Sequence, residues 1–412
     1  MNSSLESSSH PMKILFVHQF CGAMGGAETD ILLEADSIKT RGHKIALLYA
    51  SRTGRSEIAW DNTFTEQYSL ATTTVPDVIQ NFNPDTIYFH SLNDLAVLEN
   101  LLDFGAPVIR RVHDHRLYCM RGGKYNYFTR NVCQRPASWR CVFPCLGFIA
   151  RSGEGSLPFK WVSYRAKLRE IQLNRRCERL VVYSEYQKTE LVRNGFDPAN
   201  IEVRVPAHME EESVEAIPAV ADNNKNNVLF VGQLIRGKGV DLLLRALAKI
   251  RVPFHADIIG EGNHRNYCER LCAALGLSDR VTFHGFMGRE QVNQFYKQAS
   301  LLAVSSVWPE PFGLVGREAM AHSLPIVAFD SGGIREWLFD GENGFLVPWK
   351  DTDAMAACIE NLLHDKELAR QMGMRGRELM SQQQEASRLD CALEQVLLQA
   401  VRRRCQKNLV TV

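Results

Sequence analysis

The chain has 412 residues, 45% of them hydrophobic, and a formal net charge of +1, so it is long enough to bury the cores of two domains. No apolar run approaches the roughly 20 residues of a membrane-spanning helix, and the opening MNSSLESSSHP lacks the apolar core of a secretion signal. We therefore expect a cytoplasmic protein in which the eleven irregularly spaced cysteines are reduced thiols. The near-neutral sum hides residues 108–179, whose sixteen Lys or Arg and four acids give a local charge of +12 and favour an anionic partner.

The first half of the chain alternates between patterns typical of strands and of helices. A glycine-bearing loop at 21–27 follows the first strand and leads into an amphipathic helix at 28–42. Enough chain separates the strands for crossovers, so a parallel sheet with helices outside is the expected topology. The predicted strands are short apolar runs at residues 13–20, 44–50, 85–90, 106–114, 179–184 and 201–207.

The second half repeats this order, with a helix at 240–250 and strands at 227–234, 254–262, 280–287, 301–308 and 324–328. We predict an α/β protein with two Rossmann-like, doubly wound domains. The C-terminal segment is helical by its period, and spacing alone leaves either domain open as its packing partner. The expected parts are a disordered tail at 1–11, a first domain at 12–209, an acidic then asparagine-rich linker at 210–227, a second domain at 228–378 and a C-terminal helix at 379–412.

Each half carries a glycine-rich loop before a helix. Gly25 and Gly26 in the first loop let the backbone approach a phosphate at a helix N-terminus, although a tight turn without a ligand needs glycine as well. A dinucleotide site is disfavoured because the spacing is not G-x-G-x-x-G. The second loop, Gly232 to Gly239, contains Arg236 and Lys238, which suit a diphosphate; the alternative is a solvated basic loop.

Two acids eight residues apart form the sharpest motif. Proline and glycine hold Glu310 in a loop, where its carboxylate is suited to sugar hydroxyls, and Glu318 lies one turn inside the next helix, where it is suited to a ribose diol. The backbone amides of Phe312, Gly313 and Leu314 lie between them. The alternative is a pair of acids that only complement a helix dipole.

These residues resemble the GT-B glycosyltransferases of the large retaining family 4, whose signature is two glutamates separated by seven residues. The resemblance runs from Met12 to about Met374. The quoted matches are the GGAE loop at Gly25 to Glu28, Val112-His113-Asp114, Lys238-Gly239, Glu310 to Glu318, residues 259–262 and 281–285, Gly332-Gly333 with Glu336, and Asn343-Gly344.

The resemblance implies a role for each matching residue. Lys238 would neutralise the donor diphosphate, Glu310 would hold the transferred sugar and Glu318 the nucleotide ribose. The amides of Phe312, Gly313, Leu314 and Val315 would bind sugar and phosphate, Gly25 and Gly26 would face the donor from the opposite domain, and His113 would reach the reaction centre, although His113 is also compatible with a core histidine. The resemblance further implies that the C-terminal helix crosses back onto the first domain.

The chain departs from the family pattern at Gly232-Gln233-Leu234, where relatives have Gly-Arg-Leu, so one diphosphate cation is missing and Arg236 is the candidate replacement. Ser323 stands where relatives have glycine. The resemblance implies that the anomeric configuration is retained. Because no unassigned acid is placed as a nucleophile, we expect a front-face displacement that needs no divalent metal. The donor is expected to be a UDP or GDP sugar, and no cofactor is expected.

Two other functions remain open, namely a nucleotide-sugar epimerase or hydrolase of the same fold, and a catalytically silent nucleotide-binding protein. The expected acceptor is a glycan or a lipid-linked glycan. Nucleic acid is not an expected partner because no recognised binding motif is present.

The basic segment holds two further features. Cys119, Cys133, Cys141 and Cys145 invite a zinc interpretation, but without a C-x-x-C pair ordinary thiols are preferred. Residues 159–180 are predicted to form one basic helix with Phe159, Trp161 and Tyr164 near its start, which suits peripheral contact with an anionic membrane or, alternatively, a solvated helix face.

Overall fold

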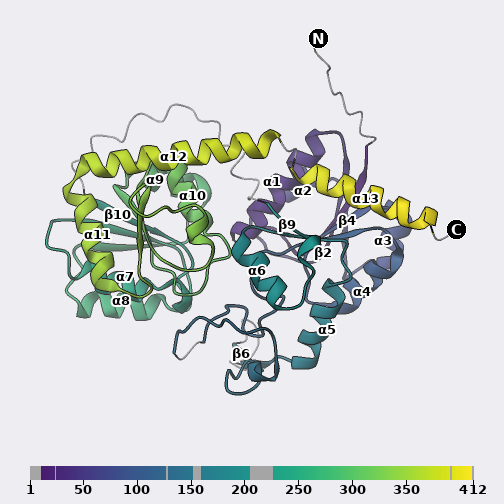
Figure 1. Cartoon of the computed structure of the whole chain (residues 1–412), viewed down its shortest axis with the longest axis horizontal. Helices are drawn as coiled ribbons and strands as arrows, with labels where there is room; N and C mark the ends of the chain where they lie inside the picture. The colour runs from purple at the N-terminus through teal and green to yellow at the C-terminus, as the bar shows by residue number, and fades with distance from the viewer. Residues whose placement is uncertain are drawn as a thin grey trace, which may run out of the picture.

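The fold is that of two α/β domains lying side by side, as a computed structural model describes it for residues 11–23, 25–126, 129–151, 159–204, 226–389 and 392–410 (Figure 1). The tail at 1–10 and most of the predicted linker lie outside these residues. The seven-stranded and the six-stranded sheet are parallel and are flanked by helices, so the predicted doubly wound architecture is confirmed.

In the first domain, the described residues form a parallel sheet with the strand order β3-β2-β1-β4-β5-β8-β9. The central strand β1 is buried along most of its length, as its continuous apolar run requires. The short β3 was not predicted from the sequence. The strands are β1 Lys13–Cys21, β2 Lys44–Arg52, β3 Gln67–Ser69, β4 Thr86–Ser91, β5 Val108–Arg111, β8 Arg179–Val182 and β9 Ile201–Val203.

Helices cover both faces of this sheet. Several begin at side-chain caps: Thr74 before α3, Asp94 before α4 and Ser184 before α6 each accept a hydrogen bond from the first turn. The helices are α1 Gly26–Thr40, α2 Glu57–Thr63, α3 Val75–Phe82, α4 Leu95–Phe104, α5 Tyr164–Asn174 and α6 Glu185–Arg193, with short 3-10 turns at Trp139–Cys141 and Pro198–Asn200.

The prediction of one helix over 159–180 is wrong. Phe159–Trp161 is strand β7, which pairs antiparallel with β6, Ile149–Arg151. Helix α5 begins only after Ser163, because that hydroxyl accepts a hydrogen bond from the Ala166 amide and so caps the helix there. Trp161 is therefore presented by a hairpin, whereas Tyr164 is the first residue of α5.

In the second domain, the described strands lie in the order β12-β11-β10-β13-β14-β15. They are β10 Asn227–Val231, β11 His255–Ile259, β12 Val281–Gly285, β13 Leu301–Val304, β14 Ile326–Phe329 and β15 Gly344–Val347. The helical elements are η4 Arg236–Lys238, α7 Val240–Leu247, α8 Arg265–Ala274, α9 Arg289–Gln298, α10 Leu314–Ala321, η5 Gly333–Glu336, α11 Thr352–His364 and α12 Lys366–Leu389.

The C-terminal segment consists of two helices with different partners. Helix α12 packs on α10 and α11 of the second domain and extends along the top of Figure 1, so residues 379–389 belong to that helix. Helix α13, Ala392–Val410, lies on the first domain, where Val396 and Leu397 join the core around Ile14 and Phe16. Its Glu394 pairs with His43 at 2.9 Å, which ties the end of the chain to the first domain.

Candidate functional site

Glu310 and Lys238, to which the family resemblance assigns the central roles, are in contact. Lys238 Nζ donates to Glu310 Oε1 at 2.6 Å. Trp308 Nε1 donates to the same oxygen at 2.9 Å, and the Ser306 hydroxyl donates to it as well. In the described part of the chain no group donates to Glu310 Oε2. Three donors thus fix the carboxylate and leave one of its oxygens for a ligand.

The electrostatics of this pair keep the carboxylate charged. Glu310 is only 4% exposed, and this burial raises its pKa, but the Lys238 ammonium and the three hydrogen bonds outweigh burial and hold the pKa below its ordinary value. Lys238 also lies 5.0 Å from the centre of the Trp308 ring, a cation–π distance. Near neutral pH the site therefore presents a carboxylate beside an ammonium group.

Lys238 is positioned by a tightly packed loop. Gly239 adopts φ +69°, and a Cβ atom there would lie 2.0 Å from the Ser305 carbonyl oxygen, so only glycine fits. The Ser305 hydroxyl donates to the Lys238 carbonyl at 3.0 Å. Arg236 lies two residues earlier on η4, and Gln233 is exposed just after β10.

Helix α10 begins between the two glutamates with Gly313 as its N-cap at φ +93°. Trp337 fixes this start, because its ring packs on Gly313 and Gly316 and its Nε1 donates to the Phe312 carbonyl at 2.6 Å. Within the described residues, the amides of Gly313, Leu314 and Val315 have no backbone or side-chain acceptor in the protein. Unbonded amides at a helix N-terminus are suited to binding an anion.

Glu318 lies inside α10, as the spacing predicted, but does not touch Lys238 or Glu310. Its Oε2 accepts a hydrogen bond from the Tyr296 hydroxyl at 2.7 Å, and His322 stacks on the Tyr296 ring. Its carboxylate is half-buried and has a fixed orientation.

The first domain contributes the glycines opposite α10. Gly25 and Gly26 are exposed at the start of α1, and a Cβ on Gly26 would lie 3.0 Å from Leu314 Cδ1. Gly26 therefore lies opposite the start of α10, and a side chain at this position would narrow the space before that helix.

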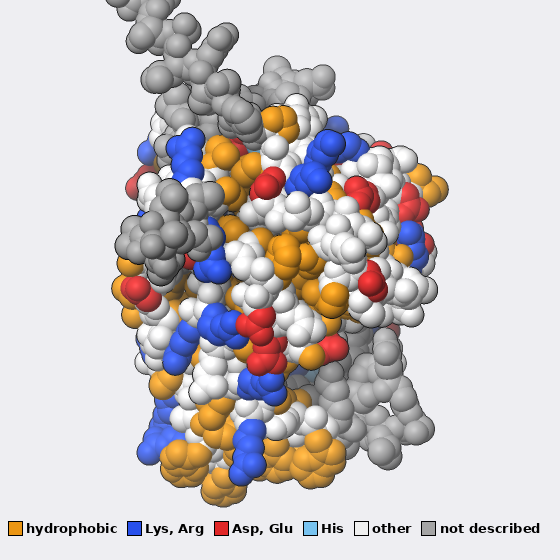
Figure 2. Space-filling view, turned by 90° about the vertical axis from the view of Figure 1, so that its right-hand side faces the viewer, with side chains coloured by type: hydrophobic (Ala, Val, Ile, Leu, Met, Phe, Trp, Pro, Cys, Tyr) orange, Lys and Arg blue, Asp and Glu red, His pale blue; other side chains and the backbone are white. Residues whose placement is uncertain are grey.

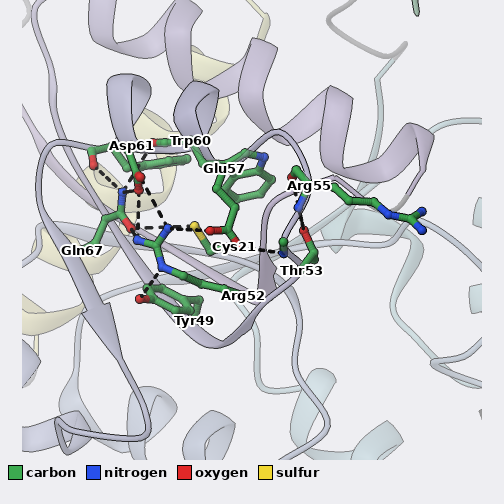
Figure 3. A network of polar contacts seen from close by, with 11 residues as sticks. Cys21, Tyr49, Arg52, Thr53, Arg55, Glu57, Trp60, Asp61 and Gln67 are labelled. Carbon is green, nitrogen blue, oxygen red and sulfur yellow. Dashed lines mark hydrogen bonds and ion pairs between the residues drawn. The ribbon is translucent and has the colours of Figure 1, made fainter. Parts of the chain in front are cut away.

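A polar network at the ends of β1 and β2 holds this part of the first domain (Figure 3). The Arg52 guanidinium bonds Asp61 at 3.0 Å and Gln67 at 3.0 Å, while the Arg55 carbonyl accepts from the Ala23 amide at 2.8 Å. The Arg55 side chain points away from the network and lies 5.5 Å from the ring of Phe286 in the second domain. The network fixes the β2–α2 loop at the interdomain rim.

The carboxyl edges of the two sheets meet around the motif at 309–312. His115 Nε2 lies 2.7 Å from the Pro309 carbonyl oxygen, and the Ser184 hydroxyl donates to the Pro311 carbonyl. Glu336 accepts from the amides of Glu185 and Tyr186, at 2.9 and 2.8 Å, at the start of α6. These contacts place the Glu310 loop at the domain boundary.

His113 is next to this boundary, but both of its ring nitrogens have protein partners. Nδ1 lies 2.6 Å from the Tyr183 hydroxyl, which itself donates to Asp30 at 2.7 Å, so His113 Nδ1 must carry the proton. Nε2 lies 3.0 Å from Nδ1 of the fully buried His90, which must therefore donate. In this arrangement His113 has no nitrogen to offer an acceptor hydroxyl.

This histidine pair predicts a pH-dependent stability. Burial holds the pKa of His90 well below its ordinary 6.5, so the folded state keeps it neutral while the unfolded state takes up a proton below that pH. Its contribution is present above pH 6.5 and is lost as the pH falls. We expect His90→Asn, which keeps a donor in the place of Nδ1, to reduce the loss of unfolding free energy between pH 7.5 and 5.5 by about 1.4 kcal/mol. Denaturant unfolding at both pH values measures the unfolding free energy. An unchanged pH dependence in the variant would contradict the prediction.

A loop of the first domain also binds the segment of the second domain that contains Lys238. Arg130 bonds both carboxylate oxygens of Asp241, at 2.7 and 3.0 Å, and donates to the Arg236 carbonyl at 2.7 Å. Charge-assisted, largely buried pairs of this kind are strong. This contact joins the two domains beside the candidate site.

We expect a double-mutant cycle on Arg130→Ala and Asp241→Ala to give a coupling of roughly 1.5–3 kcal/mol in unfolding free energy, since the hydrogen bonds join charged groups. The exchanged pair Arg130→Asp with Asp241→Arg should regain part of the stability. If the effects of the two single substitutions on the unfolding free energy were additive, they would contradict an interdomain pair. Lys249→Ala, which removes an exposed cation from the second domain, serves as the control.

Cys119, Cys133 and Cys141 lie near buried Lys124, whose ammonium forms an ion pair with Glu190 at 2.8 Å. Burial raises the pKa of the Cys141 and Cys145 thiols. Among the described residues no three His, Cys, Asp or Glu side chains are arranged to hold a metal ion.

Sequence reasoning missed several residues of this site. Trp308 and Ser306 follow β13 and resemble core residues, and Tyr296 belongs to an amphipathic helix whose apolar face hides it. These residues are recognised as part of the site only by their contacts with the glutamates in the structure. The proximity of each to a glutamate within 22 residues was the one available signal.

Comparison with known proteins places this geometry in a class. Residues 214–379 match the family model described as glycosyl transferases group 1. The match therefore falls on the second domain. Over 180 residues the chain is 34% identical to an uncharacterised glycosyltransferase of Methanocaldococcus jannaschii, an alignment that covers 43% of this chain and 45% of that protein. It is 37% identical over 158 residues to a D-inositol 3-phosphate glycosyltransferase of Nocardia farcinica, covering 36% and 35%. The chain thus spans less than half the length of these curated relatives.

In contrast to these sequence matches, the similarity to solved structures covers nearly the whole chain. Anabaena Alr3699/HepE, solved in complex with UDP-glucose, aligns with a TM-score of 0.67 and 20% identity over 97% of this chain and all of that one. Sucrose-phosphate synthase from Thermosynechococcus elongatus aligns at 0.66 with 19% identity over the same shares. At these identities the likeness concerns the fold, which is the GT-B architecture.

Proposed function

We propose that the protein is a retaining glycosyltransferase of family 4 that moves a hexose from a nucleoside diphosphate sugar to a glycan or lipid-linked glycan. The observation that carries the proposal is the Lys238–Glu310 contact beside the unbonded amides at the start of α10. An ammonium group and helix amides suit a diphosphate, and a fixed carboxylate suits sugar hydroxyls. The similarity in fold to a protein solved in complex with UDP-glucose favours a UDP sugar over a GDP sugar.

In the proposed complex, Lys238, Arg236, Gln233 and the amides of Phe312 to Val315 hold the diphosphate and the sugar. Glu318 takes the ribose, with Tyr296 orienting its carboxylate. Gly25 and Gly26 border the donor from the first domain. His113 forms part of the wall of the site, because its two nitrogens are engaged by Tyr183 and His90.

The proposed chemistry is a front-face displacement. The acceptor oxygen bonds to the anomeric carbon as the bond from that carbon to the diphosphate oxygen breaks, and the acceptor proton passes to the departing phosphate. The growing negative charge is stabilised by Lys238 and the α10 amides, so we propose that no divalent metal is required.

Two alternatives use the same fold. An epimerase or hydrolase of nucleotide sugars would work without an acceptor, and a silent nucleotide-binding protein would release no nucleotide. The first is less favoured because the Glu310 to Glu318 motif resembles that of transferases, which require an acceptor. The second is less favoured because Glu310, Glu318 and Lys238 are all present.

None of the described helices is both long and apolar enough to cross a bilayer. We propose that the protein acts in the cytoplasm and meets lipid-linked acceptors through a peripheral contact with an anionic membrane. The charge of +12 over residues 108–179 supports this contact.

The test is nucleotide release from UDP, GDP and ADP sugars, with a chelator present and with glycan or crude lipid acceptors. The proposal expects one donor to be consumed, acceptor-dependent release, retained configuration in the product and insensitivity to the chelator. Acceptor-independent turnover would favour the hydrolase or epimerase. Complete silence with every acceptor would favour the binding protein.

A further inference from the structure

Three large aromatic side chains stand in solvent on one segment of the first domain. Trp139 is 64% exposed, Phe143 66% and Trp161 80%. Trp139 and Phe143 lie on the loop before β6, and Trp161 lies on β7, at the lower end of Figure 1; hydrophobic and basic side chains gather at the lower end of Figure 2. Exposed tryptophans grouped in one place indicate an interaction surface.

The hairpin holds Trp161 in place. Strands β6 and β7 pair Ile149 with Trp161, and the Phe148 ring stacks on the Trp161 ring at 5.4 Å with an interplanar angle of 17°. The indole is supported on one face by another aromatic ring and cannot fold back into the core without breaking this stack. Its exposure is therefore built into the fold.

Arginines flank the aromatics. Arg140 lies 5.8 Å from the Trp139 ring, and α5, which begins three residues after Trp161, exposes Arg165 and Arg169. With Arg176, these two line a hollow of about 500 Å³ between α4 and α5, together with Glu99. Arg169 pairs with Glu99 and Arg176 with Asp103, whereas Arg165 has no ion pair among the described residues.

Not all of the basic side chains of residues 108–179 contribute to this exposed surface. Arg110, Arg111, Lys124 and Arg179 are buried inside the domain. The cations that reach solvent near the aromatics are those of the loop and of α5, so the usable charge is concentrated at this end of the molecule.

We propose that this surface, Trp139, Phe143, Trp161, Arg140, Arg165 and Arg169, is the one by which the protein docks on a membrane with anionic phospholipid headgroups. Indole rings prefer the interface between headgroups and acyl chains, and guanidinium groups pair with phosphates. A second copy of the chain fits less well, because a symmetric contact would oppose arginine to arginine. The inference names the surface for the proposed membrane contact and does not depend on the transferase activity.

The test is sedimentation of the full chain with vesicles of phosphatidylcholine alone and of phosphatidylcholine with phosphatidylglycerol, at low and at high salt. Binding is expected only to the anionic vesicles and is expected to weaken with salt. The triple variant Trp139→Ser, Phe143→Ser, Trp161→Ser, and separately Arg165→Glu with Arg169→Glu, should each lose roughly tenfold or more in vesicle affinity.

Ile58→Ser is the matched control, because Ile58 is 78% exposed on α2 of the same domain, outside this surface; it should bind like the unaltered chain. Circular dichroism and release of nucleotide with a water-soluble acceptor should be unchanged in all variants, which separates this proposal from the proposed reaction. Unaltered vesicle binding by the triple variant, equal binding to neutral vesicles, or a dimer in place of vesicle binding would overturn it.

Discussion

Replacing Glu310 by Gln is expected to lower the rate of sugar transfer roughly 100- to 1000-fold while nucleotide affinity changes little. The amide retains an oxygen for Lys238, Ser306 and Trp308, but an amino group replaces the acceptor oxygen Oε2 and the negative charge is lost. Single-turnover transfer and calorimetric nucleotide binding measure the two effects.

Glu310→Ala should show the same loss of rate and, in addition, a lower stability of about 1–3 kcal/mol, because buried donors lose their acceptor. Glu342→Gln, a change at an exposed glutamate paired with Arg375, is the control and should leave both quantities unchanged. Transfer by Glu310→Gln at the unaltered rate would remove this carboxylate from the mechanism.

Lys238→Ala is expected to weaken the binding of a nucleoside diphosphate and to slow transfer by about 100-fold or more, since the ammonium that stabilises the leaving group is gone. The variant also changes Glu310. Without the Lys238 charge, burial is opposed only by the hydrogen bonds from Ser306 and Trp308, so the pKa of that carboxyl group rises above its value in the unaltered protein. Residual transfer should therefore decline at a higher pH than in the unaltered protein when the pH is lowered.

The pH profile of transfer with a water-soluble acceptor measures this shift. Lys249→Ala, which removes an exposed cation paired with Asp353 in the same domain, should preserve both the rate and the acid limb of the profile. An acid limb at the same pH in Lys238→Ala would show that the lysine does not control the ionisation of Glu310.

The sequence was most informative where burial is continuous. Strands such as β1 and β10 are apolar runs because helices cover both faces of a parallel sheet, and such runs need no tertiary knowledge to be recognised. The Glu310 motif was equally visible, because proline and glycine around it are local signals. Short β3 and the β6–β7 hairpin carry too few residues to show a period.

The engagement of His113 was beyond the sequence for a physical reason. His90 and His113 lie 23 residues apart and meet only because β4 and β5 are neighbours in the sheet. Likewise, the sequence shows the net charge of residues 108–179 but not which of these cations are exposed. The fold buries Arg111 and Lys124 and exposes arginines of α5. Pairing and burial of this kind depend on tertiary contacts that periodicity does not encode.

A crystal structure of the chain with bound UDP tests the central claim most directly. The account predicts the diphosphate within hydrogen-bonding distance of Lys238 Nζ and of the amides of Gly313 to Val315, with the ribose at Glu318. A nucleotide bound elsewhere, with Lys238 and the start of α10 in contact only with solvent, would contradict it.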